Sequence, residues 1–160
     1  MKNLRFAFAL VVAAVVLGIH TPCRAQIVIG GAPFTNKSLK GSYAMEANGV
    51  FRTAKATRTM VGTGLLTSKG EGNLQVEMMV MDGVEVCSVN LSGSYAVQAN
   101  GMGTGSLTLS SAAPANGICD EFNGQQFSFA FVLERRHPAD KIKLSLGNPA
   151  FTLLCDGEEQ

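Results

Sequence analysis

Histidine limits the chemistry that this chain can do. His20 lies in an N-terminal apolar segment, and His137 is the only other imidazole, in the charged stretch "ERRHPADK". A histidine-based zinc site needs more than one such ligand, and a Ser-His-Asp triad needs a histidine held beside its serine. If the N-terminal segment is removed, a single loop histidine remains. Serine hydrolase, metalloprotease and deaminase activities are therefore excluded.

Carboxylates offer a second kind of chemistry. Glu46, Glu77 and Glu85 lie in or beside segments that alternate like strands. A carboxyl group in apolar surroundings has a raised pKa and can act as a general acid or base. Glu46 and Glu77 are thus the candidate catalytic residues of one alternative, a cyclase or isomerase of an apolar substrate. The other interpretation is that they face water, as most strand carboxylates do.

Methionine is concentrated in the stretch "VEMMVM", which contains Met78, Met79 and Met81. Thioethers bind Cu(I), but methionine also fills cores and lines adaptable apolar pockets. Alternation along a strand sends Met78 to one face and the other two to the opposite face, which argues against a three-sulfur site. We therefore predict no metal and no cofactor, and place Met78 in a core or pocket.

Residues 1–25 are predicted to be a secretory signal peptide. "MKNLR" carries two positive charges, Phe6–Ile19 is an apolar run of 14 residues, and Ala25 ends a small-residue cleavage site before Gln26. The run is shorter than the roughly 20 residues that span a bilayer, so we expect no membrane span. The mature protein is then secreted or periplasmic, with an N-terminal extension over 26–38 and one domain over 39–160.

The charge of the mature chain bears on its partners. Removing Lys2, Arg5 and Arg24 from the 13 basic residues leaves ten, against 12 acidic residues. The net charge is close to −2, and no block of basic residues occurs. We therefore expect no nucleic-acid partner.

Three cysteines remain after cleavage, Cys87, Cys119 and Cys155, and three cannot all pair within one chain. If the strands run up and down in order, Cys87 begins the fourth strand and Cys119 follows the fifth, at the same end. Cys155 ends the last strand, at the opposite end. We predict a Cys87–Cys119 disulfide and an unpaired Cys155. A nucleophilic Cys155 would lack a basic neighbour in sequence to lower its pKa.

The elements that position these residues are predicted to be strands. Apolar and polar residues alternate with period two in "LKGSYAME", "FSFAFVLE" and "KIKLSLG". Asn48-Gly49, Asp82-Gly83 and Asn100-Gly101 are type I′ turn dipeptides, and 70–73 and 147–149 also indicate turns. The expected strands are 39–47, 57–67, 73–81, 84–98, 103–111, 126–135, 140–146 and 150–155. This pattern favours an all-β fold, a closed antiparallel barrel of about eight strands, with a β-sandwich as the alternative.

A repeat supports the barrel. "LKGSYAMEANGV" (39–50) recurs as "LSGSYAVQANGM" (91–102) with eight identical positions, and each copy is followed by "GTGLLT" (62–67) or "GTGSLT" (103–108). A strand, a turn and a returning strand predict a duplicated β-hairpin. The first copy has 11 additional residues before its second strand.

These motifs, with "GEGNL" (70–74), resemble those of uncharacterised secreted bacterial proteins with small calycin-like or allene-oxide-cyclase-like barrels. The resemblance covers most of the mature chain. It implies a superfamily that includes isomerising cyclases, dirigent-type proteins and carriers of hydrophobic ligands. Kinship of fold does not determine function.

The expected function is binding of a small apolar or amphipathic molecule in the lumen, without catalysis, because the strands carry many large apolar residues and few ionisable groups. The cyclase or isomerase and a structural or surface-interaction protein are the alternatives. The candidate ligand-binding residues are Tyr43, Met45, Met78, Tyr95, Phe127, Phe129 and Phe131.

Overall fold

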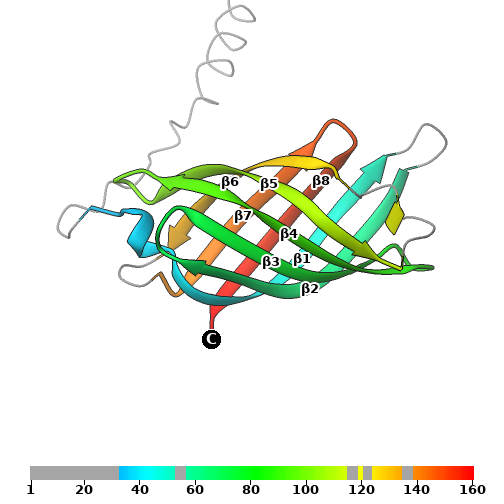
Figure 1. Cartoon of the computed structure of the whole chain (residues 1–160), viewed down its shortest axis with the longest axis horizontal. Coiled ribbons are helices and arrows are strands. Elements are labelled where there is room, and N and C mark those ends of the chain that lie inside the picture. The colour runs from blue at the N-terminus through cyan, green and yellow to red at the C-terminus, as the bar shows by residue number, and fades with distance from the viewer. Residues whose placement is uncertain (1–32, 53–56, 115–118, 121–123, 135–138) are drawn as a thin grey trace, which may run out of the picture. The chain divides into compact units, whose positions relative to one another are not determined.

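The computed structural model describes residues 33–52, 57–114, 119–120, 124–134 and 139–160 (Figure 1). The predicted signal peptide, the residues up to 32 and His137 lie outside them. A short 3-10 helix, η1 (Asn36–Ser38), precedes eight strands. The strands are β1 (Lys40–Arg52), β2 (Thr57–Lys69), β3 (Asn73–Met81), β4 (Val86–Val97), β5 (Met102–Ala113), β6 (Gln126–Glu134), β7 (Lys141–Asn148) and β8 (Phe151–Glu159).

The strands form a closed antiparallel barrel. Each strand pairs with the next, and β8 pairs with β1, so no open edge remains. This confirms the predicted barrel and excludes the sandwich. Burial alternates strictly along β3 and β6, as period two requires. Apolar side chains fill the interior, and Ser38 and Ser68 are the only buried polar residues apart from tyrosine among the described ones.

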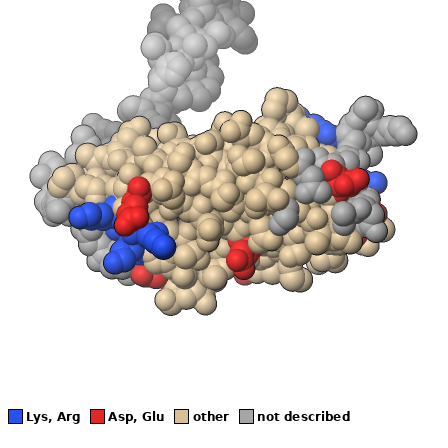
Figure 2. Space-filling view, viewed as in Figure 1, with Lys and Arg blue, Asp and Glu red and all other residues tan. Residues whose placement is uncertain are grey.

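The outer surface is poor in charge. β4 and β5 contain no lysine, arginine, aspartate or glutamate. Figure 2 shows charged side chains mainly toward the two ends of the face in view, with a largely uncharged surface between them. Within the described residues, no helix is both long and apolar enough to cross a membrane.

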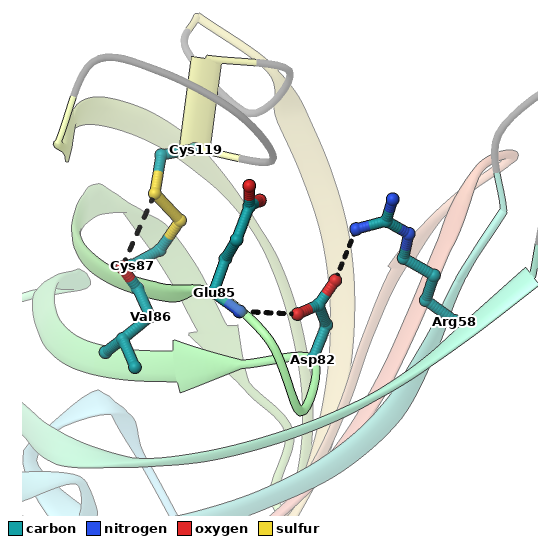
Figure 3. Close-up of a disulfide and its surroundings, with 6 residues drawn as sticks. All are labelled: Arg58, Asp82, Glu85, Val86, Cys87 and Cys119. Atoms are coloured by element: carbon teal, nitrogen blue, oxygen red, sulfur yellow. Dashed lines mark hydrogen bonds and ion pairs between the residues drawn. A yellow bond between two sulfur atoms is a disulfide. The ribbon is translucent and has the colours of Figure 1, made fainter.

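Cys87 and Cys119 form a disulfide, as predicted, with their Cα atoms 5.5 Å apart (Figure 3). Cys87 follows the first residue of β4, and the Cys119 sulfur lies 3.8 Å from the Val86 carbonyl oxygen. We call this end of the barrel the disulfide end. The opposite end, where η1 lies and β1 begins, we call the tyrosine end.

Two predicted boundaries are wrong. Asn48-Gly49 makes no turn: β1 continues to Arg52, and Gly49 pairs with Met60 of β2 and with Leu153 of β8. A Cβ at Gly49 would lie 2.2 Å from the Thr152 carbonyl oxygen, so this glycine permits close approach of β8. The last strand also continues beyond 155, to Glu159, so Cys155 lies inside β8 and not at its end.

The other turn signals are confirmed. Gly83 and Gly101 have φ values of 91° and 85°, in the region that favours glycine. Asn100-Gly101 reverses the chain between β4 and β5, where the Gln98 N–H donates to the Met102 carbonyl oxygen (2.7 Å).

The duplicated hairpin is present as β1–β2 and β4–β5, but the copies differ in register. Tyr95 pairs with Gly105, whereas its counterpart Tyr43 pairs with Leu66, two residues beyond the equivalent Gly64. An even shift keeps every side chain on its face of the sheet. The additional residues of the first copy mainly lengthen β1 and β2 beyond the repeat.

The repeated "GTG" makes room for large side chains of the next strand. Gly103 pairs with Phe131, and Gly105 pairs with Phe129. A Cβ at Gly103 would lie 2.1 Å from Phe131 Cζ, and one at Gly105 would lie 2.4 Å from Phe129 Cζ. The two phenyl rings stack with centroids 5.8 Å apart. These glycines therefore serve packing in the interior.

Replacing Gly103 with alanine should lower the free energy of unfolding by about 1–3 kcal/mol, because the new methyl group forces the Phe131 ring to move. Chemical denaturation measures the change. Thr104→Ala, at the neighbouring exposed position, is the control and should change stability by about 0.5 kcal/mol or less. Equal effects of the two substitutions would contradict the packing role.

Candidate functional site: an apolar cavity in the barrel

The barrel encloses a cavity of about 40 Å³. All eight strands contribute to its wall, and every lining side chain is apolar except the Cys155 thiol. The lining residues are Met45, Met60, Leu66, Val76, Met78, Val80, Val89, Leu91, Leu107, Leu109, Phe127, Leu144, Leu146, Phe151, Leu153 and Cys155.

The cavity occupies the middle of the barrel and the half near the disulfide end. Phe127 and Phe151, which lie near that end, line it with ring centroids 5.4 Å apart. Phe51 packs behind them, 6.4 Å from Phe151. An aromatic cluster thus borders the cavity toward the disulfide end.

The predicted ligand-binding residues divide between two places. Met45, Met78 and Phe127 line the cavity. The other four are buried nearer the tyrosine end and do not line it: Tyr43, Tyr95, Phe129 and Phe131. Alternation predicts that a side chain points inward but not its height along the barrel axis. The same alternation could have found Met60, Val80 and Val89, which sequence reasoning missed.

Tyr95 holds the tyrosine end closed. Its hydroxyl lies 2.8 Å from Ser68 Oγ, 3.0 Å from the Asn36 carbonyl oxygen and 3.2 Å from that of Leu39. The Asn36 side chain in turn accepts the Val97 N–H (2.9 Å). Through these bonds η1, which belongs to the predicted N-terminal extension, is tied to the barrel.

Tyr43 occupies the equivalent repeat position in a different environment. It is fully buried, and its hydroxyl has no hydrogen-bond partner among the described residues. Burial, and then the nearby Glu159 charge, raise its pKa to about 12. The phenol therefore stays protonated at neutral pH and makes no hydrogen bond to the part of the chain that the structure describes.

The two tyrosines should respond in opposite ways to the loss of a hydroxyl. Tyr95→Phe should lower the free energy of unfolding by about 1–3 kcal/mol, because it leaves buried polar partners unsatisfied. Tyr43→Phe should leave stability unchanged or raise it. Denaturant titration of both variants checks this. A Tyr43→Phe loss as large as that of Tyr95→Phe would show that the Tyr43 hydroxyl has a partner.

The candidate catalytic carboxylates do not face the lumen. Glu46 in β1 and Glu77 in β3 are exposed on the outer surface, each between two inward-facing neighbours. The catalytic alternative needs a carboxylate in the lumen, and neither residue meets this requirement, because alternation places their apolar neighbours inside. Neither can act as an acid or base on a molecule in the cavity.

Sulfur chemistry in the cavity is limited. Cys155 is buried and unpaired, and desolvation, followed by the Asp156 charge, raises its pKa to about 12. At neutral pH it is a thiol and a poor nucleophile. Met78 points inward while Met79 and Met81 are exposed, so the three thioethers do not converge. The described residues hold no group of three or more His, Cys, Asp or Glu side chains suited to a metal ion.

The β3–β4 turn at the disulfide end is fixed by Asp82. Its carboxylate accepts the N–H group of Val84 (3.0 Å). It also accepts the Glu85 N–H (2.9 Å) and pairs with Arg58 (2.5 Å), as Figure 3 shows. The Glu85 N–H and then the Arg58 side chain lower the pKa of Asp82 to about 2.

The lowered pKa of Asp82 predicts that its contribution to the stability of the fold depends on pH. An unfolded aspartate titrates near pH 3.9, so Asp82 stabilises the fold above about pH 4, and the contribution is lost as pH falls toward 2. Asp82→Asn should lower stability at pH 7 by about 1 kcal/mol, and wild type and variant should converge near pH 2. Thermal unfolding across this range measures the difference; a constant gap would contradict the assignment.

Comparisons with protein-family models, curated proteins and solved structures found no match, so the functional conclusion rests on the geometry of the cavity.

Proposed function

We propose that the barrel binds a slender apolar molecule, such as a single aliphatic chain, in its lumen. The observation that carries this proposal is the cavity of about 40 Å³ whose wall is apolar except for one thiol. A water molecule needs two to four polar partners, and this wall offers it almost none. An apolar guest would instead gain contacts on every side.

The wall is also adaptable. Met45, Met60 and Met78 line it with unbranched thioethers, which adopt many conformations and fit irregular guests. The small volume favours a narrow ligand, and movement of these side chains would accommodate a longer one.

The cyclase alternative is less well supported, because both carboxylates proposed for it are exposed and neither tyrosine lines the cavity. The disulfide is compatible with the oxidising compartment that the predicted signal peptide implies. We therefore propose that the protein acts outside the cytoplasm, as a carrier or binding protein.

Native mass spectrometry of the protein purified from its own host tests the proposal. Wild type should carry a small apolar adduct. Val89→Phe should lose it, because the larger side chain fills the cavity, while thermal unfolding shows the variant still folded. The matched control, Val132→Phe on the outer face of β6, should keep the adduct. The proposal would be falsified if wild type carried no adduct and took up no added n-decanol.

A further inference from the structure

Five exposed apolar residues lie together on the outer surface at the disulfide end. Val61, Met81 and Val86 form one row across β2, β3 and β4, because Met81 pairs with both of the others. Met79 lies two residues along β3, and Val84 lies in the β3–β4 turn. We call these five residues the apolar rim. Val84 is 89% exposed, and the others are 40–55% exposed.

The rim lies on the outside of the barrel end that contains the cavity. Met60 and Val80 line the cavity, and they are the chain neighbours of Val61 and of Met79 and Met81. The outer apolar surface and the inner apolar cavity are thus two faces of the same strands.

The described charges around the rim sum to a small acidic excess, because exposed Glu77 lies two residues before Met79 on the same face of β3. The Arg58 guanidinium reaches the Asp82 carboxylate beside the turn that carries Val84, as Figure 3 shows. Glu85, at the end of the same turn, adds an acidic group. A neutral, zwitterionic surface therefore suits the rim better than an anionic one.

The size of the rim discriminates between occupants. The rim has five residues, of which Val84 alone is more than 55% exposed, whereas each partner of a stable complex contributes roughly 20–30 residues. A stable protein–protein interface buries about 800 Å² per partner, so the rim alone is too small for a stable dimer. A projecting apolar turn can instead be buried in the headgroup region of a lipid layer, as interfacial apolar residues are.

We propose that the apolar rim docks onto the surface of a zwitterionic lipid bilayer. This inference deepens the proposed function and rests on it, because docking would serve to collect the ligand. An apolar ligand is poorly soluble in water and is concentrated in lipid. Docking brings the cavity-containing end of the barrel to that source.

Methionine methyl resonances test this docking in the full-length chain expressed with its own N-terminal segment. With ¹³C-methyl methionine, phosphatidylcholine vesicles should broaden the signals of Met79 and Met81. Met102, which is exposed at the tyrosine end, and the inward Met45, Met60 and Met78 should keep theirs. Unchanged Met79 and Met81 signals would overturn the proposal.

Vesicle flotation with matched variants gives the second readout. Val84→Asp should reduce co-flotation more than tenfold, whereas Val132→Asp, an exposed apolar position outside the rim, should leave it unchanged. Because residues 1–32 are identical in every variant, a difference between variants reports the rim. Equal losses in both variants would overturn the proposal. So would Met79 and Met81 signals that change with protein concentration without vesicles, which would identify a second copy as the occupant.

Docking and lumenal binding can fail separately. Val89→Phe, which fills the cavity, should still float with vesicles. If Val84→Asp loses flotation and wild type binds no apolar ligand, the proposed function fails and the docking stands; if wild type binds ligand but Val84→Asp floats as well as wild type, the docking fails.

Discussion

Phe127→Ala should be among the most destabilising single substitutions in this barrel, with a loss of about 3–5 kcal/mol in the free energy of unfolding. Phe127 is buried, lines the cavity and packs edge-on against Phe151. Truncation removes these contacts and joins the vacated space to the existing cavity, which the surrounding sheet cannot collapse to fill. Denaturant titration measures the loss.

The same variant reports on binding. The enlarged cavity should accept benzene, and benzene should raise the melting temperature of Phe127→Ala more than that of wild type, because a ligand stabilises the state that binds it. Gln126→Ala, at the adjacent exposed position, is the control and should change stability by about 0.5 kcal/mol or less. The described cavity would be contradicted if Phe127→Ala lost less stability than Gln126→Ala, or if benzene had no effect on the melting temperature of Phe127→Ala.

Removal of the disulfide should have the next largest effect. The bridge joins residues 32 apart in sequence, and the chain-entropy estimate for a loop of this length is about 3–4 kcal/mol. The double variant Cys87→Ala with Cys119→Ala should lose approximately this stability. The loss arises mainly from the greater freedom of the unfolded chain, so the barrel itself should retain its strand content by circular dichroism.

Cys155→Ala is the matched control for this experiment. Cys155 is also buried but unpaired, so its replacement removes one sulfur atom and no cross-link. Its cost should be about 1 kcal/mol. Mass mapping of the oxidised protein provides the complementary check, and a bridge to Cys155 in place of Cys119 would contradict the topology.

The fold was predictable from the sequence because period-two alternation and turn chemistry agree along most of the chain. The inward positions of Tyr43, Met45 and Phe127 follow directly from alternation. The Cys87–Cys119 bridge followed from an up-and-down strand order alone, since that order places both cysteines at one end. The turn predicted at Asn48-Gly49 was wrong because a turn dipeptide is only a local signal. The pairing of β1 with both β2 and β8 keeps this segment extended.

The site was less predictable because it depends on register and on height along the barrel. The two hairpin copies differ by two residues in register although their motifs match, because the longer first hairpin turns at a different place. Whether an inward side chain lines the cavity or fills the tyrosine end depends on that register. Tyr43 and Tyr95 illustrate the limit: with identical local sequence, the Tyr95 hydroxyl has several partners, and the Tyr43 hydroxyl has none within the described ranges.

The resemblance to calycin-like and allene-oxide-cyclase-like barrels stays a prediction. What the geometry adds is a reason to prefer binding: the cavity wall has apolar groups and one protonated thiol, and the carboxylates proposed for catalysis lie outside. The central claim is therefore that an apolar molecule enters this cavity.

The methionines provide the most direct test of that claim. Apart from Met1, three line the cavity, Met45, Met60 and Met78, and three are exposed on the outer surface, Met79, Met81 and Met102. In a ¹³C-methyl methionine spectrum, titration with n-decanol should shift the three inner resonances together and saturably, and leave the three outer ones in place. Unmoved inner resonances, or equal shifts of all six, would contradict binding in the lumen.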